Sequence, residues 1–219
     1  MPARDDRTLD EIALALAPAI ADAAVFDGWT EAALAEAAAA AGVDSDVARL
    51  AFPGGAMDMI DAWLQSVDAD MRRAFADGSL DTMKIRERIR ALVQFRLDAM
   101  LGREEALRRA WAVQAMPLNL SRSTRIAWRS ADAMWRLAGD TAADYNHYTK
   151  RALLAGIYSA TLAVFLDDES EGKAVTRAFL DRRIDGVMRF EKAKAQLLGG
   201  GKIGFDPARF LGRLRYPQR

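Results

Sequence analysis

Residues 128–151, WRSADAMWRLAGDTAADYNHYTKR, decide the fold class of this 219-residue chain. Gly139 is typical of a helix end, because a residue without a side chain adopts the left-handed conformation at little cost. Asp140, Thr141 and Asp144 can each cap a following helix, since a short side-chain oxygen accepts a hydrogen bond from an unpaired first-turn amide. The stretch therefore predicts the end of one helix, a tight turn and the start of another.

The helix after this turn carries a long apolar run from Ala152 to Leu166. A helix that is apolar nearly all round is buried, so we expect the central helix of an α-helical domain. The run is interrupted and shorter than the about 20 apolar residues that a bilayer requires. Residues 1–11 are acidic and lack an apolar segment, which argues against a secretory signal or a transit peptide. We expect a soluble, cytoplasmic protein.

Periodicity and turn residues along the rest of the chain predict an all-α fold. The expected helices cover residues 8–26, 31–41, 45–51, 56–76, 82–101, 104–115, 121–138, 144–166 and 171–198. In the fifth of these helices we expect the arginines to lie largely on a solvated face, paired with neighbouring acidic residues. They are Arg86, Arg88, Arg90 and Arg96, beside Glu87 and Asp98.

The first three expected helices, within residues 1–55, have the layout of a helix-turn-helix and resemble the N-terminal module of TetR-type regulators. The segment that would contact DNA, residues 44–50, has one arginine and two aspartates. Residues 1–64 hold 3 basic and 12 acidic side chains, a balance of −9, although the whole chain has 31 of each. Phosphate contacts dominate DNA affinity, so we expect no nucleic-acid binding. Residues 56–198 would form a larger, ligand-binding helical domain.

Few residues in the sequence suit catalysis. There is no cysteine and only one histidine, His147, so thiolate chemistry and His-rich metal sites are excluded. Phosphate-binding glycine loops and nucleophile-elbow motifs are absent from the sequence. The acidic run 167–169 lies between two expected helices and is interpreted as solvated caps. We expect a protein that is not an enzyme and needs no cofactor or metal.

The aromatic residues around the turn at Gly139 have two interpretations. Trp128, Trp135, Tyr145 and Tyr148 can be anchors of the core, or they can form a surface for a protein partner, since interfaces favour Trp and Tyr. Periodicity does not separate the two.

Several motifs, in order along residues 15–190, resemble the coenzyme Q biosynthesis accessory proteins of the Coq-nine family. The motifs are Phe26-Asp27-Gly28-Trp29-Thr30, Leu50-Ala51-Phe52-Pro53-x-Gly55, Met116-Pro117-x-Asn119, Trp128-Arg129-x-x-Asp132-x-x-Trp135, Ala138-Gly139-Asp140, Asp144-Tyr145-Asn146-x-Tyr148-Thr149-Lys150-Arg151, Tyr158-x-x-Thr161 and Phe179-Leu180-Asp181-Arg182-Arg183-Ile184. His147 stands where the family usually has an aromatic residue, which puts the conservation of the partner contact in doubt.

The resemblance implies a bacterial member with a TetR-like, lipid-binding fold that pairs as a homodimer. It would bind an isoprenoid quinone precursor and present it to a membrane-associated hydroxylase of ubiquinone biosynthesis. The implied partner surface comprises Met116, Pro117, Leu118, Asp144, His147 and Tyr148. Candidate lipid-lining residues, each equally interpretable as ordinary core, are Phe95, Met100, Trp111, Met116, Leu153, Ile157, Thr161 and Phe165.

The tail, residues 199–219, begins with a glycine-rich linker and ends in a short amphipathic segment. Phe210, Leu211 and Leu214 fall on one face, with Arg209 and Arg213 on the other. Such a segment suits an anionic membrane surface, which would hold the protein at the periphery of the inner membrane. It can equally dock on the body or stay disordered.

Two other functions are compatible with the sequence. One is a TetR-type transcriptional regulator whose larger domain senses an apolar effector, which the acidic module argues against. The other is a scaffold of the biosynthetic complex whose core is filled and binds no lipid.

Overall fold

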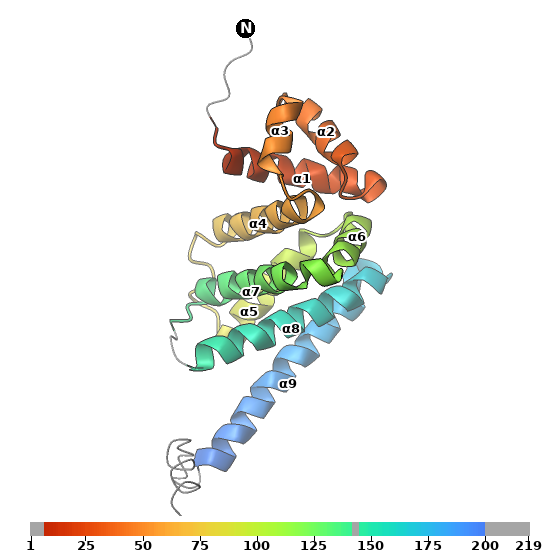
Figure 1. Ribbon diagram of the computed structural model, residues 1–219. Coiled ribbons are helices and arrows are strands. Elements are labelled where there is room, and N and C mark those ends of the chain that lie inside the picture. The colour runs from red at the N-terminus through yellow and green to blue at the C-terminus, as the bar shows by residue number, and fades with distance from the viewer. Residues whose placement is uncertain (1–6, 142–144, 200–219) are drawn as a thin grey trace, which may run out of the picture. The chain divides into compact units, whose positions relative to one another are not determined.

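The computed structural model describes residues 7–141 and 145–199, and this part of the chain is helical without a strand (Figure 1). The α-helices are α1 (Leu9–Asp27), α2 (Glu31–Ala40), α3 (Ser45–Ala51), α4 (Ala56–Ala74), α5 (Ile85–Asp98), α6 (Glu104–Gln114), α7 (Leu120–Leu137), α8 (Tyr145–Asp167) and α9 (Ala174–Gly199). Two 3-10 turns, η1 (Pro117–Asn119) and η2 (Glu171–Lys173), precede α7 and α9. The all-α prediction is confirmed.

Short polar side chains begin the first three helices, close to the expected starts at residues 8, 31 and 45. Thr8 and Glu11 form a reciprocal capping box at α1. Thr30 accepts a hydrogen bond from the Ala33 amide, and Asp44 accepts two from the first turn of α3. These side chains satisfy first-turn amides that have no partner within the helix, which explains why local sequence defines these boundaries.

Helix α1 packs against α2, α3, α4 and α6, so the N-terminal module is built onto the helices that follow it. The indole nitrogen of Trp29 donates a 2.9 Å hydrogen bond to the Ala106 carbonyl of α6. The Trp29 ring also lies 5.3 Å from that of Trp63 on α4. The first compact unit runs to Leu180 and the second begins at Asp181, both within α9. The boundary predicted between residues 55 and 56 stays a prediction.

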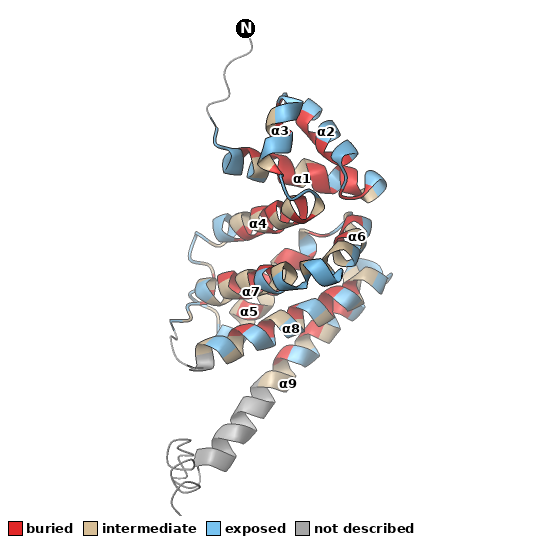
Figure 2. Cartoon of the chain, in the orientation of Figure 1, coloured by how far each residue is buried: buried red, intermediate tan, exposed pale blue. Residues whose placement is uncertain are grey.

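Helix α8 is less buried than its composition predicts. It packs against α5, α6 and α7, but its other face is exposed (Figure 2) and Leu153 there is 40% accessible. The prediction of a helix buried all round is wrong, because neighbouring helices cover only one side. Ala152, Gly156 and Ala163 are among the exposed positions, so small residues make up much of that face.

The prediction that the apolar run is too short for a bilayer is also wrong as a matter of length. Residues His147–Asp167 form one helix of 21 residues with a mean hydropathy of 1.2. Within the described ranges this is the helix whose length and composition would permit a membrane crossing, and a third of it is buried. A core helix of a soluble protein meets the same criterion. The tail residues predicted to contact a membrane, Arg209, Phe210, Leu211, Arg213 and Leu214, lie outside the described residues.

Candidate functional site

Ion pairs fix the corner between α7 and α8. The Arg151 side chain is nearly inaccessible and pairs with Asp132 at 2.6 Å and with Asp140 at 3.0 Å. Lys150 also contacts Asp140, at 2.6 Å, and the Trp135 indole donates to the Lys150 carbonyl at 2.9 Å. Partial burial alone would raise the pKa of Asp140, but the hydrogen bonds from Lys150 and Arg151 outweigh it, so the net pKa is lowered. Asp140, predicted as a possible cap, therefore acts as an ion-pair partner.

Aromatic side chains that are exposed or half-buried lie beside this corner. The Trp128 ring on α7 lies 5.9 Å from Tyr148 and 6.4 Å from His147, both on α8. Tyr148 is 63% accessible, whereas Trp135 and Trp128 are half-buried. We call Trp128, His147 and Tyr148 the aromatic patch. Of the residues predicted for the partner surface, the structure brings His147 and Tyr148 together here, and Asp144 lies outside the described residues.

The other predicted partner residues lie at η1, before α7. Met116 and Leu118 are exposed there, Leu118 almost fully at 97%, together with Leu120. Of these residues, Leu120 shares α7 with Trp128 of the aromatic patch. The two are eight positions apart, which is roughly 12 Å along a helix, a separation that a single protein partner can cover.

A polar cluster lies inside the first unit, among α4, α5, α7 and α8. Arg96 is fully inaccessible, pairs with the buried Asp68 and donates a 3.1 Å hydrogen bond to the Ser130 hydroxyl. Its guanidinium carbon lies 5.0 Å from the centre of the Tyr158 ring. The prediction that Arg96 lies on a solvated face is wrong. Arg96 follows Leu92 by four positions and Val93 by three, which places it on the buried face of α5.

This cluster leaves buried hydrogen-bonding groups without a partner. They include Nε of Arg96 and the hydroxyl of Tyr158. Burial alone would lower the pKa of Arg96, but the nearby Tyr158 hydroxyl and the Asp68 carboxylate outweigh it and raise the pKa. The Tyr158 hydroxyl is thus close to the guanidinium without meeting the geometry of a hydrogen bond. Unpaired buried polar atoms are rare in folded proteins.

The polar cluster lines a small cavity of about 60 Å³. Its wall is formed by Trp63, Leu64, Arg96, Leu107, Ala110, Trp111, Gln114, Ile126, Ala127, Ser130, Tyr158, Ser159 and Leu162. Trp111, Gln114 and Ala127 are half-buried and Ser159 is exposed, so the cavity extends from the polar cluster toward the surface. The combination of an apolar wall and a few polar groups is typical of small-molecule sites.

One of the predicted lipid-lining residues, Trp111, lies in this wall. Met100, Thr161 and Phe165 are buried, and Phe95 and Ile157 are half-buried. Met116 and Leu153 are exposed. The polar residues of the wall are not among the predicted site residues, and Arg96 was expected on a solvated face because arginine is usually exposed.

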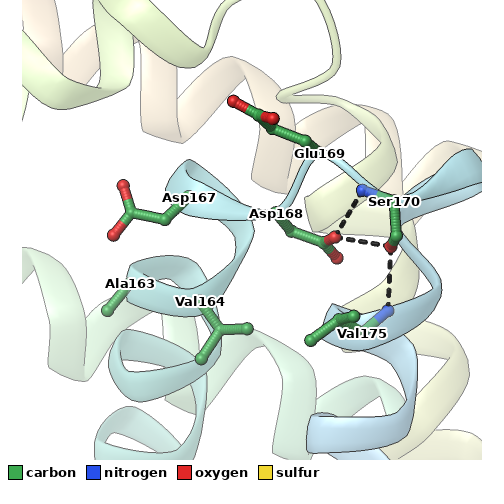
Figure 3. Close-up of a pocket in the computed structure, with 7 residues that line it drawn as sticks. All are labelled: Ala163, Val164, Asp167, Asp168, Glu169, Ser170 and Val175. Atoms are coloured by element: carbon green, nitrogen blue, oxygen red, sulfur yellow. Dashed lines mark hydrogen bonds between the residues drawn. The ribbon is translucent and has the colours of Figure 1, made fainter.

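A larger hollow, of about 510 Å³, is an open depression where α8 meets η2 and α9 (Figure 3). It is lined by Ala163, Val164, Asp167, Asp168, Glu169, Ser170 and Val175. Asp168 is buried there and accepts hydrogen bonds from the amides and hydroxyls of Ser170 and Thr176. Burial alone would raise the pKa of Asp168, but these hydrogen bonds lower it far below its usual range. The interpretation of residues 167–169 as solvated caps is wrong for Asp168, which is a buried cap.

Acidic and histidine side chains do not gather into a metal site in the ranges that the structure describes: no three of them could share an ion.

The family model and the known proteins that this chain resembles carry the same name, COQ9. Residues 120–191 match the family model described as COQ9. The chain is 31% identical over 181 residues to ubiquinone biosynthesis protein COQ9, mitochondrial, of Rattus norvegicus, covering 80% of this chain and 58% of the rat protein. The human protein of the same name is 29% identical, with 80% and 57% covered. That of Schizosaccharomyces pombe is 27% identical, with 86% and 74% covered. The chain thus spans little more than half of the mammalian relatives.

A solved structure confirms the fold. The crystal structure of a TetR transcriptional regulator from Nitrosomonas europaea superposes with a TM-score of 0.63 at 24% identity, covering 80% of this chain and 97% of that one. The predicted TetR-like architecture is therefore correct. At that identity the similarity concerns the fold alone.

Proposed function

The chain carries a COQ9-family domain, which confirms the resemblance predicted from its motifs, and on this premise we propose that it is a non-catalytic accessory protein of ubiquinone biosynthesis. It binds an isoprenoid quinone precursor within its helical bundle and presents that precursor to a membrane-associated hydroxylase. The relatives' name, ubiquinone biosynthesis protein, supports the pathway. The lipid and the hydroxylase are parts of the proposal.

The observation that carries the proposal is the cavity beside Arg96. Its wall brings together apolar side chains such as Trp63, Trp111 and Leu162 from α4, α6 and α8. A polyprenyl tail is costly to expose to water, at about 0.8 kcal/mol per methylene. An apolar route between helices would lower the barrier to moving such a lipid out of a bilayer. Because the cavity is small, at about 60 Å³, binding of a lipid requires the wall to open.

The aromatic patch supports delivery to a protein partner. Tyr and Trp are favoured at interfaces because they combine a large apolar area with a polar group. Together with Met116 and Leu118, Tyr148 would offer apolar area to an incoming hydroxylase. Asp144 and Pro117 stay in the proposed surface from the family resemblance. This contact would differ most from the family's at His147, where the family usually has an aromatic residue.

Delivery also needs contact with a membrane. We place the protein at the periphery of the cytoplasmic membrane, where the basic amphipathic segment around Phe210 would bind anionic lipid. The relatives are named mitochondrial, and the inner-membrane location is part of the proposal for this chain. A homodimer is part of the same proposal and is tested by light scattering on the full chain.

The test is native mass spectrometry with lipid extraction on the full chain, purified from a ubiquinone-producing host. We expect a bound isoprenoid quinone or precursor. Ala127→Trp should abolish it, because the bulky ring would fill the cavity wall on α7. Ala112→Trp is the matched control, since Ala112 is exposed on α6. Absence of lipid, together with failure to load any from liposomes, would favour a lipid-free scaffold. Effector-dependent DNA binding would favour the regulator instead.

A further inference from the structure

We infer that Nε of Arg96 and the hydroxyl of Tyr158 together recognise an oxygen atom on a neutral aromatic or quinone ring. The inference rests on the proposed function, because it names the headgroup chemistry that the cavity would receive. It assigns the headgroup to the interior of the bundle, against α5 and α8.

The hydrogen-bonding capacity at the inner end of the cavity carries this inference. Arg96 donates through Nη1 to Asp68 and through Nη2 to Ser130, whereas its Nε–H has no hydrogen-bond partner. The Tyr158 hydroxyl is equally buried and without a partner. Both residues belong to the cavity wall. Two unpaired donors in the wall of one cavity can both bond a single oxygen acceptor, and satisfying them on binding would recover the free energy that their burial costs.

The charge around the cluster favours a neutral acceptor. Asp68 already compensates Arg96 within the core. The neighbouring charges between α4 and α7 are also paired, Arg122 with Asp58 and Arg129 with Asp61, each at 2.5 Å. A carboxylate or phosphate ligand would bring an uncompensated charge into this buried place, which is costly. A carbonyl, phenol or ether oxygen would not.

The part of the cavity wall next to Arg96 and Tyr158 suits an aromatic or quinone ring. Trp63 and Trp111 line it together with Ile126 and Leu162. The cavity of about 60 Å³ admits only a few heavy atoms in this state. A ring substituent can therefore reach Arg96 and Tyr158, whereas the ring and its tail must displace half-buried wall residues such as Trp111 and Gln114. A water molecule also fits a cavity of this size and is the competing occupant.

The experiment is calorimetric titration of the full chain with decylubiquinone and with decylbenzene, which has the same tail but no oxygen. For Tyr158→Phe we expect about fivefold weaker binding of decylubiquinone, the value of one neutral hydrogen bond. Binding of decylbenzene should be unchanged. The melting temperature should not fall, because the hydroxyl has no partner to lose. Thr124→Val is the control, since it also removes a hydroxyl group but at an exposed position of α7 outside the cavity wall.

Equal affinity of the wild type and Tyr158→Phe for decylubiquinone would overturn the inference. Arg96 and Tyr158 would then be hydrogen-bonded to a water molecule, and the proposed lipid binding would be unaffected. A fivefold loss for both probes would also overturn the inference, because the variant would then have altered the shape of the cavity. If the wild type bound neither probe, the proposed lipid site itself would be wrong. The two failures are therefore distinguishable.

Discussion

Arg96 on α5 and Asp68 on α4 form an ion pair from which solvent is excluded on both sides. Arg96 and Asp68 are 28 positions apart in sequence, and their pair joins α5 to α4. Arg96 also donates a hydrogen bond to the Ser130 hydroxyl, which connects the pair to α7. A buried pair contributes little net stability when complete, but removing one partner leaves a buried charge uncompensated. The pair therefore constrains which helices can pack around the cavity.

Replacing Arg96 by methionine should lower the free energy of unfolding by about 3–5 kcal/mol, because Asp68 would remain buried without a counter-ion. Urea denaturation of the full chain measures this loss. The double variant Arg96→Met with Asp68→Leu should regain most of it, since both charges are then gone. A double variant as unstable as the single one would mean that steric fit, and not charge, dominates at this place.

The same pair shows what sequence reasoning could and could not predict. Helix boundaries depend on neighbouring residues, so the helices expected from residues 31 and 45 begin where the structure has α2 and α3. Arg96 follows Leu92 and Val93 at helical spacing, which indicates the buried face of α5, whereas its charge favours an exposed position. Which residue pairs with Arg96 depends on how α4 crosses α5, and no local pattern contains that information. The partial exposure of α8 has the same cause.

Asp168→Asn should destabilise the protein near pH 7 and lose its effect in acid. The folded-state pKa of Asp168 is lowered below its ordinary value of 3.8. The ionised carboxylate therefore contributes stability above that value, and the contribution is lost as the pH falls below it. Thermal unfolding at pH 7, 5, 4 and 3 should show the difference between wild type and variant shrinking from roughly pH 4 downward. A difference independent of pH would contradict an electrostatic cap.

The corner between α7 and α8 should depend on Arg151 far more than on its neighbour Arg136. Both pair with Asp132, at 2.6 and 2.7 Å, but the Arg151 side chain is 2% and the Arg136 side chain 72% accessible. Arg151→Met should cost about 3 kcal/mol, because it leaves Asp132 and Asp140 partly buried without their shared cation. Arg136→Met should cost under about 1 kcal/mol, as for exposed pairs. Equal losses in urea denaturation would show that burial does not set the strength of this network.

Leu118 offers the sharpest test of the proposed partner surface, because it is 97% accessible and contributes little to the core. Leu118→Ser should leave the melting temperature nearly unchanged, since exposed substitutions alter stability by about 0.5 kcal/mol or less. In a host whose own copy is deleted, the variant should nevertheless lower the ubiquinone content measured by chromatography. Leu50→Ser is the matched control, as Leu50 is an exposed leucine on α3 at 64% accessibility, in the N-terminal module. Normal ubiquinone content with Leu118→Ser, or an equal loss with both variants, would remove Leu118 from the surface that binds the hydroxylase.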